Sequence, residues 1–409
     1  MTTLINTPVK QGPALPEFVA LMALISSLVA MSIDAVLPAL PSIASDLAVT
    51  DYRQTQWVIT SIILGMSVGQ LFFGPLSDAF GRKFAITSGV ALFSIGSLLA
   101  MSANSLTMLI IGRVLQGIGV SGPRIASMAL VRDKYVGDQM ARVMSFVMMV
   151  FIIVPMLAPI IGQWIMHLFG WHAIFGFVMA LAIIATLWLG IRQPETLAVA
   201  ARRPFHMSSI VETTLRVLKN PRVLGFAITS GLVFGGLLSY VSSAQAIFQD
   251  IYHLGESFPY YFAALAFGIG LASLANSALV VRFGSLRLSV IALSAMFGLS
   301  AALLIASVIS AGIPPLWVFM SLGFAVFFCV GILFGNLNSL AMVPLGRMAG
   351  IGAAVIGSVS NLVAVPVAGG VGWFFNGTLI PIVTGLCLCA ALSLMIVLAV
   401  RHKDDGALT

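Results

Sequence analysis

The chain has 409 residues, of which 60% are hydrophobic and only 8% are charged, and it carries a formal net charge of +7. Charged residues make up about a quarter of a typical soluble protein, so this composition excludes a soluble globular protein and indicates a membrane protein with many spans. The cations stand at the ends of apolar runs rather than in one basic patch, so we expect no binding to nucleic acid.

The apolar runs between glycine, proline and charged residues predict twelve membrane-spanning helices, because about 20 apolar residues cross the hydrocarbon core as a helix. The expected spans are residues 18–40, 55–76, 84–103, 106–130, 142–167, 171–191, 222–247, 258–281, 286–310, 315–341, 348–372 and 378–400. The first run is too long for the apolar part of a cleavable signal peptide, so we expect it to remain as the first helix.

A basic connector, residues 192–221, divides the chain into an N-terminal half, residues 1–191, and a C-terminal half, residues 222–409. A weak internal repeat supports this division. The loop after the eighth run reads RFGSLR, with Gly284 and Arg287, and it lies about 200 residues beyond Gly81, which stands in the loop after the second run. We therefore expect an all-α membrane protein built from two pseudo-symmetric halves of six helices each.

The positions of lysine and arginine predict the orientation, because these residues are enriched in cytoplasmic loops. With the N-terminus inside, only Arg53 lies in an outside loop. The cytoplasmic side then holds Lys10, Arg82, Lys83, Arg132, Lys134, Arg142, the cluster from Arg192 to Arg222, Arg282, Arg287, Arg347, Arg401 and Lys403. We expect both termini in the cytoplasm.

The stretch GPLSDAFGRK, residues 74–83, joins the second and third predicted helices. We expect Gly74 and Pro75 to end the second helix, Asp78 to accept hydrogen bonds from backbone donors, and Gly81 to allow a tight bend. Any short cytoplasmic hairpin needs glycine and a few cations, so the charges alone would be weak evidence. The full pattern resembles the loop between helices 2 and 3 of the major facilitator superfamily of transporters, with Gly74, Leu76, Asp78, Gly81, Arg82 and Lys83 in place.

This resemblance implies two six-helix halves with a substrate cavity between them near the midplane, which opens to each side in turn as one half rocks against the other. It also implies a latch formed by Asp78, Arg82 and Asp133, which ties the second helix and the start of the third to the fourth when the cavity is open outward. The alternative for these charges is simple solvation at the interface.

Charges at membrane depth are expensive and point to function. Counted from Phe18 at 1.5 Å per residue, Asp34 lies about 24 Å into the first helix, and Arg113 lies about 10 Å below the outer end of the fourth. We expect the two to pair or to alternate in holding a proton-linked charge. The alternative for Asp34 is a brace at the helix end before Pro38 and Pro41.

Arg113 belongs to LIIGRVLQGIG, which resembles the arginine motif of helix 4 in the same superfamily, with Gln116, Gly117 and Gly119 also in place. The resemblance implies that Arg113 couples proton binding to substrate release. The alternative is a structural arginine bonded to neighbouring carbonyl groups. Arg124, eleven residues later on nearly the same face, either favours acidic substrates from the cavity wall or pairs with a carboxylate near the inner surface.

The fifth predicted helix contains VPMLAPIIGQW, with Pro155, Pro159 and Gly162, and proline removes a backbone hydrogen bond and bends a helix. This stretch resembles the antiporter motif of drug exporters in the superfamily, which its importers lack. Two positions depart from the motif: Ala158 and Gln163 stand where glycine is usual.

Further stretches resemble the Bcr/CflA group of drug:proton antiporters, namely IDAVLPALPSIASDL, ALVRDKY, RVMSFVMMV, APIIG, GWHAIFGF and RRPFHM. The C-terminal half matches more loosely and has no charge at membrane depth. Its polar candidates for the substrate cavity are Tyr240, Gln245, Asn276, Asn336, Asn338 and Asn361. Most of them are as well explained as hydrogen-bonding contacts between helices.

These observations predict a proton-coupled multidrug efflux antiporter of a bacterial inner membrane, with small, partly hydrophobic drugs as substrates, the bilayer as its surroundings, and a monomeric state. The alternative is an exporter or symporter of one metabolite, such as a nucleoside, amino acid or sugar. Cys329, Cys387 and Cys389 lie in apolar runs without a nearby histidine or acid, so we expect no metal site, and protons are the only coupling ion. We find no catalytic constellation and expect no enzyme.

Overall fold

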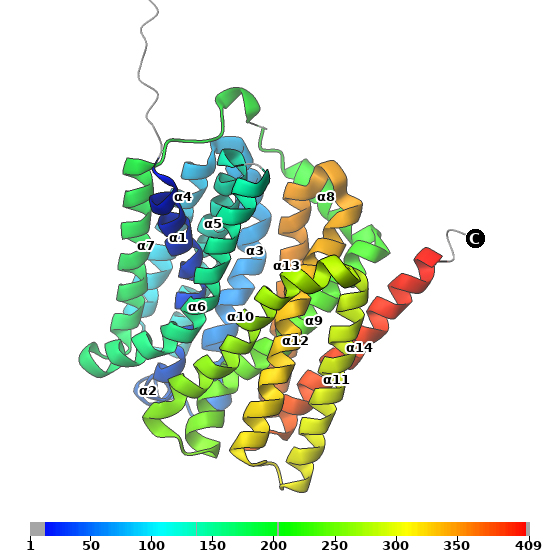
Figure 1. The fold of residues 1–409 in the computed structure, drawn as a ribbon. Coiled ribbons are helices and arrows are strands. Elements are labelled where there is room, and N and C mark those ends of the chain that lie inside the picture. The colour runs from blue at the N-terminus through cyan, green and yellow to red at the C-terminus, as the bar shows by residue number, and fades with distance from the viewer. Residues whose placement is uncertain (1–12, 136, 203, 406–409) are drawn as a thin grey trace, which may run out of the picture.

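The computed structural model describes residues 13–135, 137–202 and 204–405, and every regular element within them is a helix (Figure 1). Lys10 and Arg203 lie outside the described residues. So do the side chains of Arg142, Arg347, Arg401 and Lys403, which the orientation argument also used.

The N-terminal half contains seven α-helices and two 3-10 turns among the described residues. They are α1 (Leu15–Asp34), η1 (Leu37–Ala39), α2 (Leu40–Asp46), η2 (Tyr52–Thr55), α3 (Gln56–Phe80), α4 (Arg82–Met101), α5 (Leu106–Lys134), α6 (Gly137–Phe169) and α7 (His172–Arg192).

The connector and the C-terminal half follow in the same manner. They contain η3 (Val199–Ala201), α8 (Met207–Lys219), α9 (Pro221–Gln245), the π-helical turn η4 (Ala246–Ile251), η5 (Gly255–Ser257), α10 (Phe258–Phe283), α11 (Ser285–Ile309), α12 (Leu316–Met342), η6 (Val343–Met348), α13 (Ala349–Trp373) and α14 (Ile380–Asp405).

Eleven stretches of the described chain are helical, long and apolar enough to cross a membrane, and α6 adds a shorter apolar segment, Ile153–Phe169. The chain is therefore an all-helical membrane protein with many spans. The prediction of twelve spans in two sets of six stays a prediction, because it needs α6 as the twelfth.

The two halves lie side by side in Figure 1, and the segment from α7 through α8 to α9 passes across one end of the bundle. We call this end the connector end and the opposite end, which carries α2, the α2 end. The halves meet mainly where α3 packs against α13 and where α6 packs against α10.

Two helix ends differ from the sequence prediction. The first helix stops at Asp34 rather than near residue 40, because Pro38 and Pro41 cannot donate backbone hydrogen bonds and the chain continues as η1 and α2. The second helix does not end at Gly74 and Pro75 but runs through them to Phe80. Gly81 ends it instead, with a φ of 107°, a conformation that essentially only glycine adopts.

The connector contains a helix, α8, which is not among the predicted helices. This helix has a buried side, with Ile210, Thr213 and Val217 in contact with the bundle. The spacing of three and four residues between them is the helical period, a signal that the sequence already contained.

Candidate functional site

Arg113 is completely buried and joins three helices of the N-terminal half. Its Nε donates to the carbonyl oxygen of Val58 in α3 at 2.7 Å, and its Nη1 donates to the carbonyl oxygen of Ser32 in α1 at 2.7 Å and to Gln116 Oε1 at 3.0 Å. Gln116 in turn donates to Ser97 Oγ of α4 at 2.8 Å. Arg113 is thus bonded to neighbouring carbonyl groups, as the structural alternative for this residue predicts.

Asp34 is the last residue of α1 and is 7% exposed, and it forms no ion pair with Arg113, contrary to the predicted pairing. The physical reason lies in the helix end. The last carbonyl groups of a helix lack intrahelical donors, so the carbonyl of Ser32 is free to bind the guanidinium. The side chain of Asp34 does not cap η1 either, so the bracing role has no support.

The C-terminal half contributes Tyr240 to the neighbourhood of Asp34. This α9 residue is 3% exposed, and its hydroxyl has no hydrogen-bond partner among the described residues. Its ring packs against Phe248, Phe262 and Phe327, with centroids 4.7 to 6.5 Å apart. Helix α9 packs against η1, the turn that follows Asp34 at the end of α1. Asp34 therefore lies close to where the N-terminal half meets α9.

Helix α6 continues through Pro155 and Pro159 and brings Gly162 against the end of α1. A Cβ atom at Gly162 would overlap the carbonyl oxygen of Ala35, the residue after Asp34. The three residues of the predicted antiporter stretch thus belong to the helix that packs directly against the Asp34 site.

Arg124 is exposed in the half of α5 nearer the connector end, and it forms no ion pair with any described residue. Eleven residues correspond to about three helical turns, so Arg124 lies on the face from which Arg113 reaches α1 and α3. Arg124 is therefore exposed on the side of α5 that faces α1 and α3. The alternative role, pairing with a carboxylate near the inner surface, has no support in the described part of the chain.

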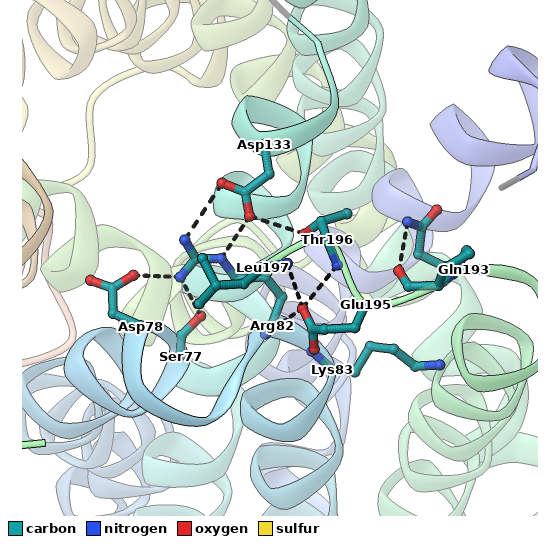
Figure 2. A network of polar contacts seen from close by, with 10 residues as sticks. Ser77, Asp78, Arg82, Lys83, Asp133, Gln193, Glu195, Thr196 and Leu197 are labelled. Carbon is teal, nitrogen blue, oxygen red and sulfur yellow. Dashed lines mark hydrogen bonds and ion pairs between the residues drawn. The ribbon is translucent and has the colours of Figure 1, made fainter. Parts of the chain in front are cut away.

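A second polar site, the Arg82 cluster, lies at the connector end (Figure 2). Arg82 Nε donates to Asp133 Oδ2 at 2.8 Å, and its Nη1 donates to Asp78 Oδ1 and to Ser77 Oγ. The structure thus brings together the three predicted members Asp78, Arg82 and Asp133. Asp78 pairs with a side chain here, in place of the backbone donors that we had expected.

The sequence analysis missed the connector's part in this cluster. The backbone N–H groups of Arg82 and Lys83 each donate to the carboxylate of Glu195 at 3.0 Å, and Thr196 Oγ1 donates to Asp133 Oδ2 at 3.0 Å (Figure 2). A carboxylate at a helix N-terminus satisfies free donors and the helix dipole. Lys83 Nζ donates to the carbonyl oxygen of Gly190 at 3.0 Å. In the sequence, this contact is indicated only by the acidic residue Glu195 shortly after the sixth apolar run.

At the α2 end, hydrogen bonds join the two halves. Arg53 Nη1 donates to the carbonyl oxygen of Trp373 at 3.1 Å, and Gln56 Nε2 donates to Ser243 Oγ at 3.3 Å. Asp51 accepts hydrogen bonds from Arg53, which hold the pKa of this carboxyl below its ordinary value. The Arg82 cluster is therefore intact in a conformation whose halves are joined at the α2 end, so it does not require a cavity open at that end.

The polar candidates of the C-terminal half do not form one site. Asn336 Nδ2 donates to Asn276 Oδ1 at 2.8 Å and so joins α12 to α10, which supports the role of a contact between helices. Gln245 is buried and donates to Gln249 at 2.6 Å, Asn338 is exposed, and Asn361 is buried. A cavity of about 420 Å³ lies elsewhere, between α6 and α10 at the α2 end, and none of these candidates lines it.

Comparison with known proteins gives consistent matches over the length of the chain. The family described as Major Facilitator Superfamily matches residues 22–369. A bicyclomycin resistance protein homolog of Haemophilus influenzae is 31% identical over 92% of this chain and 94% of its own length. Multidrug resistance protein D of Escherichia coli is 29% identical over 80% of this chain and 81% of its own. The human organic anion transporter MFSD10 has a similar fold, with a TM-score of 0.68 at 14% identity, covering 95% of this chain and all of its own.

Proposed function

Because the chain belongs to the Major Facilitator Superfamily, a family of transporters rather than enzymes, we propose that it exports small, partly hydrophobic drugs in exchange for protons. The names of two relatives that match most of the chain support drugs as the substrate class. We further propose that it acts as a monomer in a bacterial inner membrane, with the connector end and both termini in the cytoplasm.

The observation that carries proton coupling is the environment of Asp34. Its carboxyl is 7% exposed, lies at the break of α1 and has no hydrogen-bond donor among the described residues. The turn η1 that follows it packs against α9, the helix of the other half that carries Tyr240. Burying an ionised carboxylate without a partner costs far more free energy than burying the protonated carboxyl. Loss of the proton therefore favours a conformation that gives Asp34 water or a donor.

This dependence links the proton to the relative position of the halves. Asp34 belongs to the N-terminal half and Tyr240 to the C-terminal half, so a rocking motion changes the distance between them. Arg113 has one donor, Nη2, without a partner among the described residues. We propose that Arg113 or Tyr240 donates to ionised Asp34 in the conformation that follows proton release, and that Arg113 holds the α1 break in place during this change.

The experiment that tests this proposal compares export of a fluorescent drug from proteoliposomes with and without an imposed pH gradient. We expect the wild type to depend on the gradient and Asp34→Asn to lose this dependence. Asp250→Asn, the same change at an exposed carboxylate of the α2 end, is the matched control and should behave as the wild type. Gradient-driven export by Asp34→Asn at the wild-type rate would refute Asp34 as the proton carrier.

Arg124 favours a second candidate, a transporter of one metabolite that carries an acidic group. An exposed guanidinium on the side of α5 that faces α1 and α3, without an ion pair to any described carboxylate, suits an anionic substrate. Growth rescue against a panel of drugs distinguishes the two candidates. Protection from several unrelated neutral or cationic drugs supports multidrug export, whereas a narrow range that disappears in Arg124→Gln supports the metabolite.

A further inference from the structure

Helix α8 of the connector has two apolar faces, and only one of them contacts the protein. The covered face consists of Ile210, Thr213 and Val217, which are 5%, 7% and 0% exposed and pack toward α13 and α9. The second face consists of Met207, Val211, Leu215 and Leu218, which are 50%, 51%, 49% and 42% exposed. No described residue covers this second face, which we call the α8 stripe.

The order of side chains around α8 matches that of a helix lying at a membrane surface. At about 100° per residue, the α8 stripe occupies an arc of roughly 80° directly beside the covered face. Ser208, Glu212, Arg216 and Lys219 follow on its other side. The apolar stripe thus lies between the protein and a polar, partly basic face, as in helices that insert one side into the boundary between headgroups and acyl chains.

The charge of the connector indicates which lipid would suit this face. Residues 192–222 include six arginine and lysine residues but only two glutamates. Glu195 is already bound by the backbone of Arg82 and Lys83, and Arg192 pairs with Glu17. Glu212 pairs with Arg216, but both side chains are exposed, so Arg216 can still reach a lipid headgroup. The remaining excess is positive, and basic residues beside an apolar stripe bind anionic lipid surfaces.

We propose that the α8 stripe inserts into the leaflet at the connector end and that Arg216 and Lys219 bind the headgroups of anionic phospholipids there. The place of α8 in the fold supports this occupant. The connector enters α8 from the Arg82 cluster, through Glu195 and Thr196, and leaves it into α9, whose first turn is capped by Asn220. Helix α8 therefore lies at the end of a membrane bundle, near the level at which the helices leave the bilayer. The inference requires only a membrane-embedded chain, whatever its substrate.

The test uses the full-length protein in nanodiscs of phosphatidylcholine with and without phosphatidylglycerol. Leu215→Cys in the stripe and Ser208→Cys on the polar face each receive an environment-sensitive fluorophore, and lipids with a spin label high in the acyl chain quench it. The native cysteines are controlled by the same labelling of the unsubstituted chain. We expect at least about twofold stronger quenching at Leu215 than at Ser208.

The charge is tested in the same preparation. We expect quenching at Leu215 to increase with phosphatidylglycerol and to lose this increase in Arg216→Gln with Lys219→Gln, while the unfolding temperature stays unchanged. Equal quenching at both labels would overturn the insertion of the stripe and indicate water or a protein partner there. Stronger quenching at Leu215 that ignores phosphatidylglycerol would overturn the headgroup binding.

Discussion

The turns after α3 and α10 use the same backbone device in two different surroundings. Gly81 and Gly284 have φ values of 107° and 74°, with ψ values of 162° and 153°, and each joins two long helices through a single residue. A Cβ atom at Gly81 would overlap the carboxylate of Glu195, whereas one at Gly284 would have nothing within 4 Å. The glycine turn is repeated in both halves, but the charged residues that surround Gly81, such as Glu195, have no counterpart around Gly284 in the part of the chain that the structure describes.

The same contrast extends through the membrane. Among the described residues, the N-terminal half buries Arg82 and Arg113 with fixed polar partners and Asp34 without a hydrogen-bond donor. The C-terminal half buries an aromatic group around Tyr240, and its buried Asn336 donates to the half-buried Asn276. A buried charge needs several fixed partners, while aromatic rings need only shape. Within the described part of the chain, the buried charges therefore lie in the N-terminal half, and the C-terminal half buries mainly aromatic and amide side chains.

The largest expected effect comes from Arg113→Gln. Glutamine cannot reach the carbonyl groups of Ser32 and Val58 together, and each buried acceptor left without a donor costs about 1–3 kcal/mol. We expect gradient-driven transport to decrease by more than about tenfold and the unfolding temperature to drop.

Arg113→Lys separates geometry from charge in this experiment. Lysine keeps the positive charge but not the planar fork that reaches two carbonyl groups. We expect it to restore little of the lost stability. Full recovery with lysine would show that charge alone matters, and the N-terminal half would then be less constrained than the structure indicates.

The two glycine turns allow a matched comparison of Gly81→Ala with Gly284→Ala. Both alanines enter a region that is nearly restricted to glycine, at a cost of about 1–3 kcal/mol. Only the alanine at 81 also displaces Glu195 from the start of α4. We expect Gly81→Ala to lower the unfolding free energy by at least about 1 kcal/mol more than Gly284→Ala. Equal losses, measured by thermal unfolding in detergent, would show that the contact with Glu195 adds nothing.

A smaller effect is expected from Tyr240→Phe, which tests whether the C-terminal half supplies only shape. Removing a buried hydroxyl without a partner should leave stability unchanged or slightly improved. If the hydroxyl serves Asp34 in another conformation, gradient-driven export should decrease severalfold while drug exchange without a gradient is preserved. Unchanged gradient-driven export would reduce Tyr240 to a packing residue.

The sequence predicted most helix positions because apolar length and punctuation by glycine, proline and charge are local properties. The eleventh and ninth expected spans, for example, differ from α13 and α11 by one residue at each end. The early end of α1 was missed because the apolar run continues past Asp34, and hydropathy does not register a change from α-helix to 3-10 turn.

The sites were predicted less completely because their partners are distant in the chain. The Arg82 cluster followed from one short motif, but the bonds from Arg82 to Glu195 span 113 residues. The partners of Arg113 are backbone carbonyl groups, which every residue has and no sequence pattern marks. The sequence therefore indicated which charged side chains are costly to bury in the membrane, whereas the structure was needed to show which groups bind them.

The smallest expected effect concerns the contact that bridges the halves at the α2 end. Arg53 lowers the pKa of Asp51 from its ordinary 3.8, so the pair is stabilised at every pH above that value and loses this stabilisation only when the pH falls through the lowered pKa. Between about pH 5.5 and 8 the contact is constant. Arg53→Gln removes the bond to Trp373 and should change transport by less than about twofold, since Arg53 is exposed and Asp51 is only half-buried. The change should be the same factor across this pH range in proteoliposome assays. A factor that varies with pH would instead link this contact to the proton cycle and place part of the coupling in the bridge between the halves rather than at Asp34.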